Sequence, residues 1–387
     1  LIYIQRIINK LLTMNTSESN ETSGVILNEE YETTSADANT ATSEVSRTTY
    51  ERKFLNTGKE VNADYSAVVG FEENLYVFGG LDSDYDRTNE CWVYIYDSNT
   101  WESLPPMKEK REFCRAALVD EKVYVTGGKD DDYNYLASVE IFNYRTRSWM
   151  YGRKMINSHK RHVAVTVGSE IYVLGGMNVL WGMYTFAGLT KKCERLNTSL
   201  IIPESSWIKK VCGCNKKESK KESWTEIPDM PYEAQGCAAV LKDEKIYVMG
   251  GYNNKEFLDT MVVYDINTTS WTKQYAMNTP RFNATAIVYK NNICIIGGQS
   301  SHGFHSSVEV WSEDEEEFIV EKSLVLTIPK ASFRIIITNK QQLLAMGGKN
   351  NYGDSSSLLQ RIDNNTMQYS VECANNALSS NEGYVIN

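Results

Sequence analysis

The sequence predicts an all-β fold: a six-bladed β-propeller with four antiparallel strands per blade, preceded by a disordered N-terminal tail. Three observations support it. A Gly-Gly dipeptide recurs at the end of short apolar runs, a spaced pair of large residues follows each one, and the repeats have a near-constant length. A supersecondary unit copied at a fixed period is typical of rings and solenoids.

The Gly-Gly dipeptide marks six repeats. Its first glycines stand at positions 79, 127, 175, 250, 297 and 347, so the steps are 48, 48, 75, 47 and 50 residues. Glycine suits the end of a strand because it accepts positive φ and permits close approach of neighbouring backbone. The excess length in the third repeat predicts an insertion at about residues 199–223.

Each glycine pair is followed by a polar loop, a short strand-like run, a turn and a second aromatic residue. Phe142 and Trp149 are seven residues apart, and most repeats keep this interval. The first repeat shortens it to five, from Tyr96 to Trp101. An alanine- and valine-rich run then precedes the next glycine pair, so each repeat holds four strand-like segments separated by turn residues.

Four antiparallel strands in 45 to 50 residues fit a propeller blade. A small twisted sheet cannot cover both of its faces alone, so neighbouring blades must stack and bury the aromatic residues between them.

The double glycine with its spaced aromatic residues resembles the kelch-repeat family, over roughly residues 63–373. The resemblance implies a propeller whose loops bind a partner at one mouth of the ring. It also implies that the residue sixteen positions before each glycine pair is often an arginine facing that mouth. Here these positions hold Ala63, Arg111, His159, Ala234, Arg281 and Ala331. We therefore expect Arg111, Arg281 and His159 to take part in partner binding.

The expected domain organisation is a tail over 1–48, a propeller over 49–376 and a C-terminal tail over 377–387. Residues 15–48 have too few large apolar groups to offset chain entropy. Two segments compete for the outer strand that closes the ring, residues 49–55 and the segment around Tyr369. Met14 is a candidate start of translation, and a sequence lacking its beginning is the other interpretation.

Composition argues against several classes of protein. The formal net charge is −10, which disfavours a nucleic-acid or anionic-membrane partner, and no apolar run is long enough to span a bilayer. Eight cysteines show no repeating pairing pattern, which favours a reducing compartment and a cytoplasmic location. Against this stand six N-x-S/T sequons, which we interpret as turn residues. A signal peptide within residues 1–13 is only weakly indicated.

The loops after the first two glycine pairs are rich in aspartate and tyrosine. They contain Asp82, Asp84, Tyr85 and Asp86 in the first repeat and Asp130, Asp131, Asp132 and Tyr133 in the second. Such an acidic patch with rigid aromatic anchors would suit a basic peptide, although solvated loop carboxylates are the simpler interpretation. Trp181 and Tyr184 in the longer third loop are further candidates for partner contact, or for core packing.

No motif in the sequence indicates a cofactor or metal. Cys212 and Cys214 lack the second ligand pair of a structural zinc site. The acids over 82–86 lack the glycine and the final glutamate of a calcium loop. The four histidines form two H-x-x-H pairs, whose spacing on a strand does not aim both rings at one point. We expect no enzymatic activity.

The leading hypothesis is a non-catalytic module that binds a peptide or protein partner. Many kelch proteins are substrate-recognition subunits of cullin-RING ubiquitin ligases, although the BTB and BACK domains of those subunits are not visible upstream of residue 49. Actin binding is the alternative, with the lysine-rich insertion as the contact. A third reading is a propeller enzyme acting on sugars, such as a sialic acid mutarotase or the copper-dependent galactose oxidase.

Overall fold

The computed structural model describes residues 65–387 except 73, 83, 96, 97, 99, 180–186, 201–222, 327, 338–342, 351–357, 363–368, 374–383 and 387. Trp181, Tyr184 and Tyr96 therefore lie outside the described residues, as do Ala63, the predicted tail over 1–48 and the candidate closing segment 49–55. The description below concerns the compact unit Phe54–Asn387.

The first two repeats each form a four-stranded antiparallel sheet with its strands in sequence order. The first contains β1 (Ala67–Phe71), β2 (Asn74–Leu81), β3 (Arg87–Ile95) and β4 (Thr100–Leu104). The second contains β5 (Arg115–Val119), β6 (Lys122–Thr126), β7 (Val139–Asn143) and β8 (Ser148–Tyr151). In both sheets the glycine pair lies at or just after the end of the second strand.

The third repeat is extended at its Gly-Gly loop. Its sheet contains β9 (Val163–Val167), β10 (Glu170–Leu174), β13 (Cys193–Asn197) and β14 (Trp224–Ile227). The loop forms its own hairpin of β11 (Met177–Val179) and β12 (Ala187–Leu189), and the 3-10 helix η1 (Thr198–Leu200) follows β13. The predicted insertion about 199–223 begins at η1, and most of it lies outside the described residues.

The fourth and fifth repeats repeat the four-stranded pattern. The fourth contains β15 (Ala238–Lys242), β16 (Lys245–Met249), β17 (Thr260–Asp265) and β18 (Ser270–Ala276). The fifth contains β19 (Thr285–Tyr289), β20 (Asn292–Ile296), β23 (Ser307–Ser312) and β24 (Glu317–Val325), with a hairpin of β21 (Gln299–Ser300) and β22 (Gly303–Phe304) in its Gly-Gly loop.

The last sheet differs from the others because it has five strands. It contains β25 (Arg334–Ile337), β26 (Leu343–Met346), β27 (Leu358–Ile362), β28 (Tyr369–Cys373) and β29 (Tyr384–Ile386). The sequence predicted four strands in each of six blades, whereas five sheets have four strands and this last sheet has five. β28 occupies the outer position that the sequence assigned to the segment around Tyr369, and β29, within the predicted C-terminal tail, pairs along its free edge.

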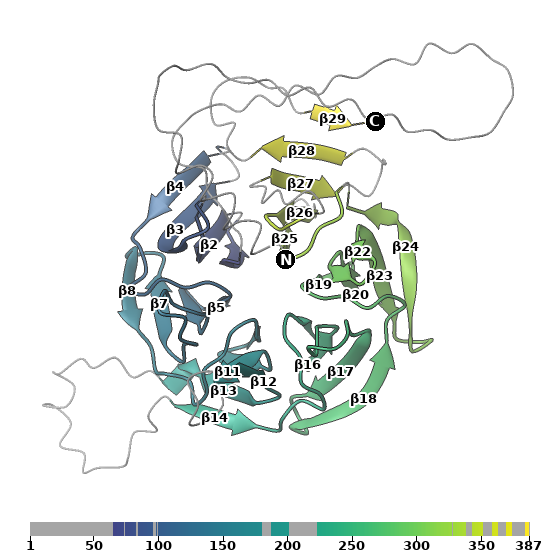
Figure 1. Ribbon diagram of the computed structural model, residues 1–387, viewed down its shortest axis with the longest axis horizontal. Coiled ribbons are helices and arrows are strands. Elements are labelled where there is room, and N and C mark those ends of the chain that lie inside the picture. The colour runs from purple at the N-terminus through teal and green to yellow at the C-terminus, as the bar shows by residue number, and fades with distance from the viewer. Residues whose placement is uncertain are drawn as a thin grey trace, which may run out of the picture. The chain divides into compact units, whose positions relative to one another are not determined.

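The sheets follow one another around a ring (Figure 1). The innermost strands β1, β5, β9, β15, β19 and β25 each contact the next one, and β25 contacts β1. This closed cycle confirms the propeller arrangement.

The core lies in the seams between neighbouring sheets. Among the described residues, five hydrophobic clusters each combine side chains of two adjacent sheets. Phe78 of β2 is fully buried, and its ring lies 5.9 Å from that of Phe142 and 5.5 Å from that of Trp149 in the next sheet. Burial of one such ring contributes about 1.5–3 kcal/mol, so stacking supplies what a single sheet lacks.

In the first, second, fourth and fifth repeats the aromatic pair lies side by side across the two outer strands. Phe142 faces Trp149, and Tyr264 faces Trp271. In the first repeat the partner of Trp101 is Tyr94, seven residues earlier, so the assignment to Tyr96 was wrong and the interval of seven is kept.

Candidate functional site

Two sets of loops meet at one mouth of the propeller. The residue that follows a Gly-Gly pair forms a bridge with a residue just before the innermost strand of the same sheet, as between Lys129 and Glu112 and between Met177 and Lys160. The sequence predicted this meeting of loops. In the second to sixth repeats it places the start of the inner strand next to the Gly-Gly loop.

Six residues at this mouth, one per sheet, form what we call the inner ring. They are Tyr65, Phe113, Arg161, Gly236, Asn283 and Ser332, with φ of 58°, 57°, 52°, 65°, 53° and 62°. Each of the last five donates its backbone N–H to the carbonyl of the previous member, over 2.8–3.1 Å. Left-handed backbone costs a non-glycine residue about 1–2 kcal/mol, so these positions are held by the surrounding hydrogen bonds.

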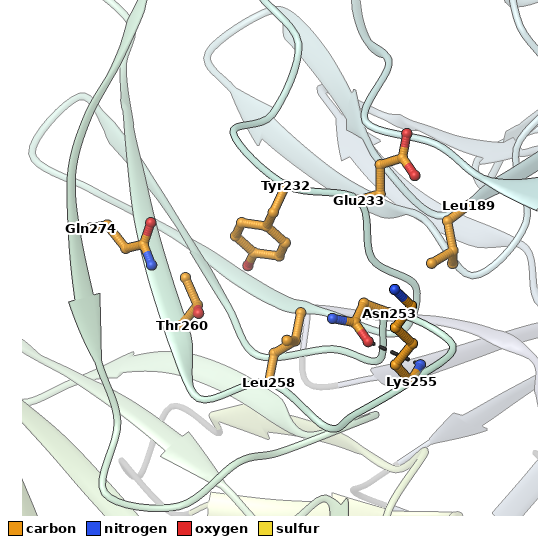
Figure 2. Close-up of a pocket in the computed structure, with 8 residues that line it drawn as sticks. All are labelled: Leu189, Tyr232, Glu233, Asn253, Lys255, Leu258, Thr260 and Gln274. Atoms are coloured by element: carbon orange, nitrogen blue, oxygen red, sulfur yellow. Dashed lines mark hydrogen bonds between the residues drawn. The ribbon is translucent and has the colours of Figure 1, made fainter.

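A cavity of about 400 Å³ lies between the third and fourth sheets, apart from the inner ring (Figure 2). Tyr232, Leu258 and Thr260 form one side, and Glu233 and Leu189 lie opposite. The Tyr232 hydroxyl donates to the carbonyl of Gly250 over 3.3 Å, and burial raises the pKa of this phenol well above its usual range. Because the phenol stays neutral and its hydroxyl is already hydrogen-bonded, the residues around this cavity are suited to packing.

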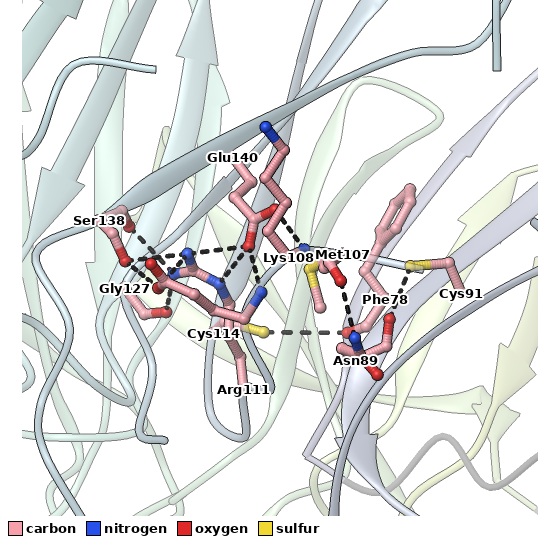
Figure 3. A network of polar contacts seen from close by, with 11 residues as sticks. Phe78, Asn89, Cys91, Met107, Lys108, Arg111, Cys114, Gly127, Ser138 and Glu140 are labelled. Carbon is pink, nitrogen blue, oxygen red and sulfur yellow. Dashed lines mark hydrogen bonds and ion pairs between the residues drawn. The ribbon is translucent and has the colours of Figure 1, made fainter. Parts of the chain in front are cut away.

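Arg111 does not face the mouth, contrary to the prediction. Its side chain is fully buried and donates to the Gly127 carbonyl (2.9 Å), to both oxygens of Ser138 (2.9–3.0 Å) and to the Glu140 carboxylate (Figure 3). Glu140 in turn accepts the backbone N–H groups of Lys108 and Glu109. The arginine thus joins the incoming loop to the second and third strands of its sheet.

The same arrangement recurs in two other repeats. Arg281 donates to the Gly297 carbonyl (2.6 Å) and the Glu309 carboxylate (2.9 Å), and it is 1% exposed. His159 is fully buried between the Gly175 carbonyl (2.8 Å) and Glu194 (3.1 Å). All three candidates from the sequence are therefore structural, because a buried, saturated side chain has no donor left for a ligand.

The fourth and sixth repeats have other residues at the position of Arg111. In the sixth repeat Lys330 occupies it, one residue before the predicted Ala331, and donates to the Gly347 carbonyl over 3.2 Å. Its own carbonyl accepts from Gly298, as that of Arg111 accepts from Gly80. In the fourth repeat Ala234 is buried, and the position of the carboxylate is taken by the buried Val262. Cation and carboxylate are thus lost together.

The acidic loops are partly occupied by their own backbone. Asp82 accepts the N–H groups of Asp84 and Asp86 over 3.0 Å, and Asp130 accepts that of Asn134 over 2.8 Å. Asp131 pairs with Lys110 at 2.8 Å, both partly exposed. Asp84, Asp86 and Asp132 are exposed, as are Tyr85 and Tyr133. The acids and tyrosines are therefore accessible, but two of the six carboxylates serve the turns.

The mouth is more basic than the sequence suggested. The Tyr133 ring, 65% exposed, has the Arg87 guanidinium 4.4 Å and the Lys129 ammonium 4.1 Å from its centre. Glu112 is the carboxylate near both, at 2.7 Å from Arg87 and 3.9 Å from Lys129. Cation–π contacts of this kind hold an exposed ring in one orientation.

Two further cations continue this surface towards the inner ring. Lys160 lies 4.5 Å from the Tyr135 ring centre, and Arg161 lies 3.9 Å from that of Phe113. Burial, with help from Arg161 and Lys129, lowers the pKa of Lys160 to about 8. No motif in the sequence indicated Lys160 and Arg161, although they stand one and two positions after the candidate His159.

The described residues contain no group of three or more histidine, cysteine, aspartate or glutamate side chains placed to hold a metal ion. Five cysteines in the described part of the chain are buried and free. In the same part of the chain, no helix is long and apolar enough to cross a membrane.

Comparison with known proteins matches this architecture. The family model described as the KLHDC2/KLHL20/DRC7 Kelch-repeats domain matches residues 38–217 and 209–383. Kelch-like protein 41a of Danio rerio is 29% identical over 112 residues, 27% of this chain and 19% of that protein. Kelch-like protein 40 of Xenopus laevis is 32% identical over 107 residues, 26% of this chain and 17% of that protein.

Spermatocyte protein spe-26 of Caenorhabditis elegans is 28% identical over 145 residues, 35% of this chain and 25% of that protein. The matched part of the chain thus spans a quarter or less of these relatives' own lengths. A solved structure described as that of YjhT superposes with a TM-score of 0.62 at 16% identity, covering 81% of this chain and 98% of the other. At that identity the likeness concerns the fold alone.

Proposed function

Since this chain belongs to the kelch-repeat family, we propose that it is a non-catalytic interaction module that holds a segment of a partner protein at the mouth of the propeller. The observation that carries this proposal is Tyr133. Its ring is 65% exposed and makes cation–π contacts with both Arg87 and Lys129. Aromatic side chains that are exposed and already ordered lose little entropy on binding, which is why they recur as anchors of interfaces.

Selection of peptides from a displayed library on the full chain tests this proposal. We expect segments that bind the wild type and that bind Tyr133→Ala at least tenfold more weakly. Tyr151→Ala is the matched control, since Tyr151 is 51% exposed and also contacts a cation, Lys108 at 4.5 Å, but on the outer strand β8. Failure to select any segment, or equal loss in both variants, would refute binding at this mouth.

A role as the substrate receptor of a ubiquitin ligase is the finer form of this proposal. One relative, from horsepox virus, is called Kelch repeat and BTB domain-containing protein 1 and is 22% identical over 120 residues. Such a receptor needs a cullin-binding partner or domain in addition to the propeller. We expect a cullin to co-precipitate with the full-length protein. Deletion of the regions outside the propeller should abolish this co-precipitation.

Actin binding stays a prediction. The lysine-rich insertion that motivated it lies largely outside the described residues. Co-sedimentation with actin filaments, with and without residues 201–222, distinguishes binding through the insertion from binding elsewhere.

We also propose a reducing compartment such as the cytoplasm. Burial raises the pKa of the Cys193 and Cys237 thiols to about 12, and Cys114 and Cys294 are also buried and free. Thiols of this kind behave as small apolar side chains. Fractionation of cells that express the tagged full-length protein tests the location.

A further inference from the structure

The outer strands of the second and fifth sheets expose apolar side chains at positions where other outer strands are polar. In β8 the two residues after the paired aromatic residue are Met150 and Tyr151, and in β24 they are Ile319 and Val320. All four side chains are exposed. The same two positions hold Glu-Ser in β4, Thr-Glu in β14 and Thr-Lys in β18. Exposed apolar groups that gather on one edge mark a candidate interaction surface.

Both strands are also free edges of their sheets. They come last in the orders β5-β6-β7-β8 and β19-β20-β23-β24, so no described strand pairs along their outer sides. An edge strand presents unpaired backbone N–H and C=O groups, to which a further strand can add. The sixth sheet shows such an addition within the chain, because β29 pairs along the outer side of β28. The edges of β8 and β24 are therefore suited to accept a strand from another molecule.

The charges around these two edges have opposite signs. Residues 144–156, which contain β8, include four basic residues and no acidic one. Residues 312–322, which contain the first part of β24 and the turn before it, include six acidic residues and one lysine. The edge of β8 is thus apolar and basic, and the edge of β24 is apolar and acidic. Opposite charges on two such surfaces favour their association.

The basic residues of the β8 edge fall into two groups. Arg145 and Arg147, in the turn before the strand, already form ion pairs with Glu121 and Glu102. Arg153 and Lys154, which follow the strand, are exposed and have no ion pair within the described residues. The positive charge that is free for a partner therefore lies at the C-terminal end of β8.

The free acidic residues of the β24 edge lie at the opposite end of their strand. Asp314 and Glu315 in the turn and Glu317 at the start of β24 are exposed, and none of them has an ion pair in the described part of the chain. Glu313, in contrast, pairs with Lys242. The negative charge that is free for a partner therefore lies at the N-terminal end of β24.

Antiparallel pairing of β8 with β24 brings both kinds of group together, because the C-terminal end of one strand then meets the N-terminal end of the other. One alignment places Met150 opposite Val320, Tyr151 opposite Ile319 and Arg153 opposite Glu317. Apolar and oppositely charged residues that face each other across two strands stabilise their pairing. Parallel pairing would instead bring the acidic turn to Arg145 and Arg147, which already have partners.

We propose that β8 of one copy of this chain pairs in antiparallel fashion with β24 of a second copy. The two strands belong to repeats that are three apart in a ring of six, and they lie on opposite sides of the ring (Figure 1). Each copy therefore offers one edge of each kind, and the contact is head-to-tail. A head-to-tail contact that does not close leaves a free edge at either end. The expected product is an open chain of propellers.

This inference goes beyond the proposed function, because both edges lie on the outside of the ring and the proposed peptide site lies at its mouth. The contact is small, since β8 has four residues. Interfaces at the low end of the size range are typical of weak, transient association. We therefore expect self-association that grows with protein concentration and declines as salt screens the charges.

Sedimentation velocity of the full chain, at concentrations up to the high micromolar range, tests the proposal. For the wild type we expect the average sedimentation coefficient to rise with concentration beyond that of a dimer. Arg153→Glu and Glu317→Lys should each weaken this association at least tenfold, because each variant places like charges opposite each other. An equimolar mixture of the two variants should associate again, since every contact in an alternating chain then joins opposite charges.

The mixture also shows that both variants are folded, because unfolded chains would not restore the contact. Glu226→Lys is the matched control, since Glu226 is exposed on the outer strand β14 and its replacement changes the net charge as Glu317→Lys does. This control should associate like the wild type. The double variant Ile319→Thr, Val320→Thr keeps two β-branched side chains but removes apolar surface, and it should weaken association at least tenfold.

A wild type that stays monomeric, or that stops at a dimer, would overturn the proposal. Unchanged association in the two charge variants would do the same, as would failure of their mixture to associate. Loss of association only on deletion of residues 201–222 would assign the contact to the insertion and also overturn the proposal. Peptides selected at the mouth should bind Arg153→Glu as they bind the wild type, so this proposal and the proposed function fail separately.

Discussion

At the scale of single residues, the buried polar pairs next to the Gly-Gly ends of the second, third and fifth repeats behave as units. Arg111 with Glu140, Arg281 with Glu309 and His159 with Glu194 are each buried and joined by hydrogen bonds. The fourth repeat replaces both members with apolar residues, Ala234 and Val262. Joint replacement is expected, because leaving one buried charge without its partner destabilises a fold more than removing both members of the pair.

Breaking one of these pairs should therefore cost more than removing it. Arg111→Ala leaves Glu140 buried without its cation, and we expect a loss of about 3–5 kcal/mol in the free energy of unfolding. Adding Glu140→Val, which copies the fourth repeat, should restore at least half of that loss. Urea denaturation measures both values. A double variant as unstable as the single one would show that the pair is needed as such.

Lys330 introduces a pH dependence into the sixth repeat. Burial lowers the pKa of this ammonium from its ordinary value of 10.5 to about 8. Between these pH values the unfolded chain binds more protons than the folded one, so the contribution of Lys330 to stability rises with pH. The stability of the wild type relative to Lys330→Met should accordingly increase by about 1–3 kcal/mol between pH 8 and 10.5.

Urea denaturation of both proteins across this pH range gives the difference in their free energies of unfolding. The contributions of groups that titrate in both proteins cancel in this difference. Lys245→Met controls for the loss of one charge, since Lys245 is exposed on β16. A difference that is flat or falls with pH would contradict the burial of Lys330.

At the scale of secondary-structure elements, the Gly-Gly pair at the end of a strand joins one sheet to the next through a backbone hydrogen bond. The first glycine leaves room for the carbonyl of the following repeat, and the second donates its N–H to that carbonyl, as Gly128 does to His159 over 2.8 Å. A Cβ on Gly127 would lie 2.3 Å from the same oxygen. Tryptophans add a second tie between sheets, because Trp149 donates to the Pro105 carbonyl over 2.7 Å.

Two glycines separate the effect of steric contact from that of backbone strain. Gly127 and Gly168 have nearly the same φ, +60° and +56°, but a Cβ on Gly168 would meet nothing within 4 Å. We expect Gly168→Ala to cost about 1–2 kcal/mol and Gly127→Ala about 2–5 kcal/mol in the free energy of unfolding. Equal losses, measured by thermal or urea unfolding, would mean that the seam relaxes around the added methyl group.

At the scale of the whole molecule, the proposed interaction surface depends on closure of the ring. The six innermost strands contact one another in a cycle, and this brings residues far apart in the sequence to a common mouth. Arg115 and Arg334 come from the second and sixth repeats, and yet the charge of Arg334 adds to the effect of burial in lowering the pKa of Arg115. An open stack of the same sheets would separate them. The interaction surface is therefore a property of the ring and of no single repeat.

The repeat pattern predicted most of the fold. The glycine pairs, the seven-residue spacing and the strand-like runs gave the antiparallel sheets, their order and the meeting of the two loop sets. Two positions were assigned to the wrong residue. The first repeat was misread by two residues at Tyr96, and the sixth by one at Ala331.

The candidate site was less accessible to sequence reasoning. Arginine at a position that often faces the mouth predicts a ligand contact, but Arg111 and Arg281 bind buried carboxylates on the third strands of their own sheets. The aspartate-rich loops predict an accessible acidic patch, but Asp82 and Asp130 accept backbone N–H groups of their own turns. Which group a side chain hydrogen-bonds depends on the direction in which it points. The spacing of residues in the sequence does not give that direction.

The sequence by itself determined that identical small sheets must stack, because the apolar periodicity and the glycines are local properties that each repeat carries. Only the tertiary structure decided which charges are neutralised and which are not. That balance depends on distances between repeats, and electrostatic energies change steeply with distance and burial. The inner-ring cations therefore became visible only once the ring had closed around them.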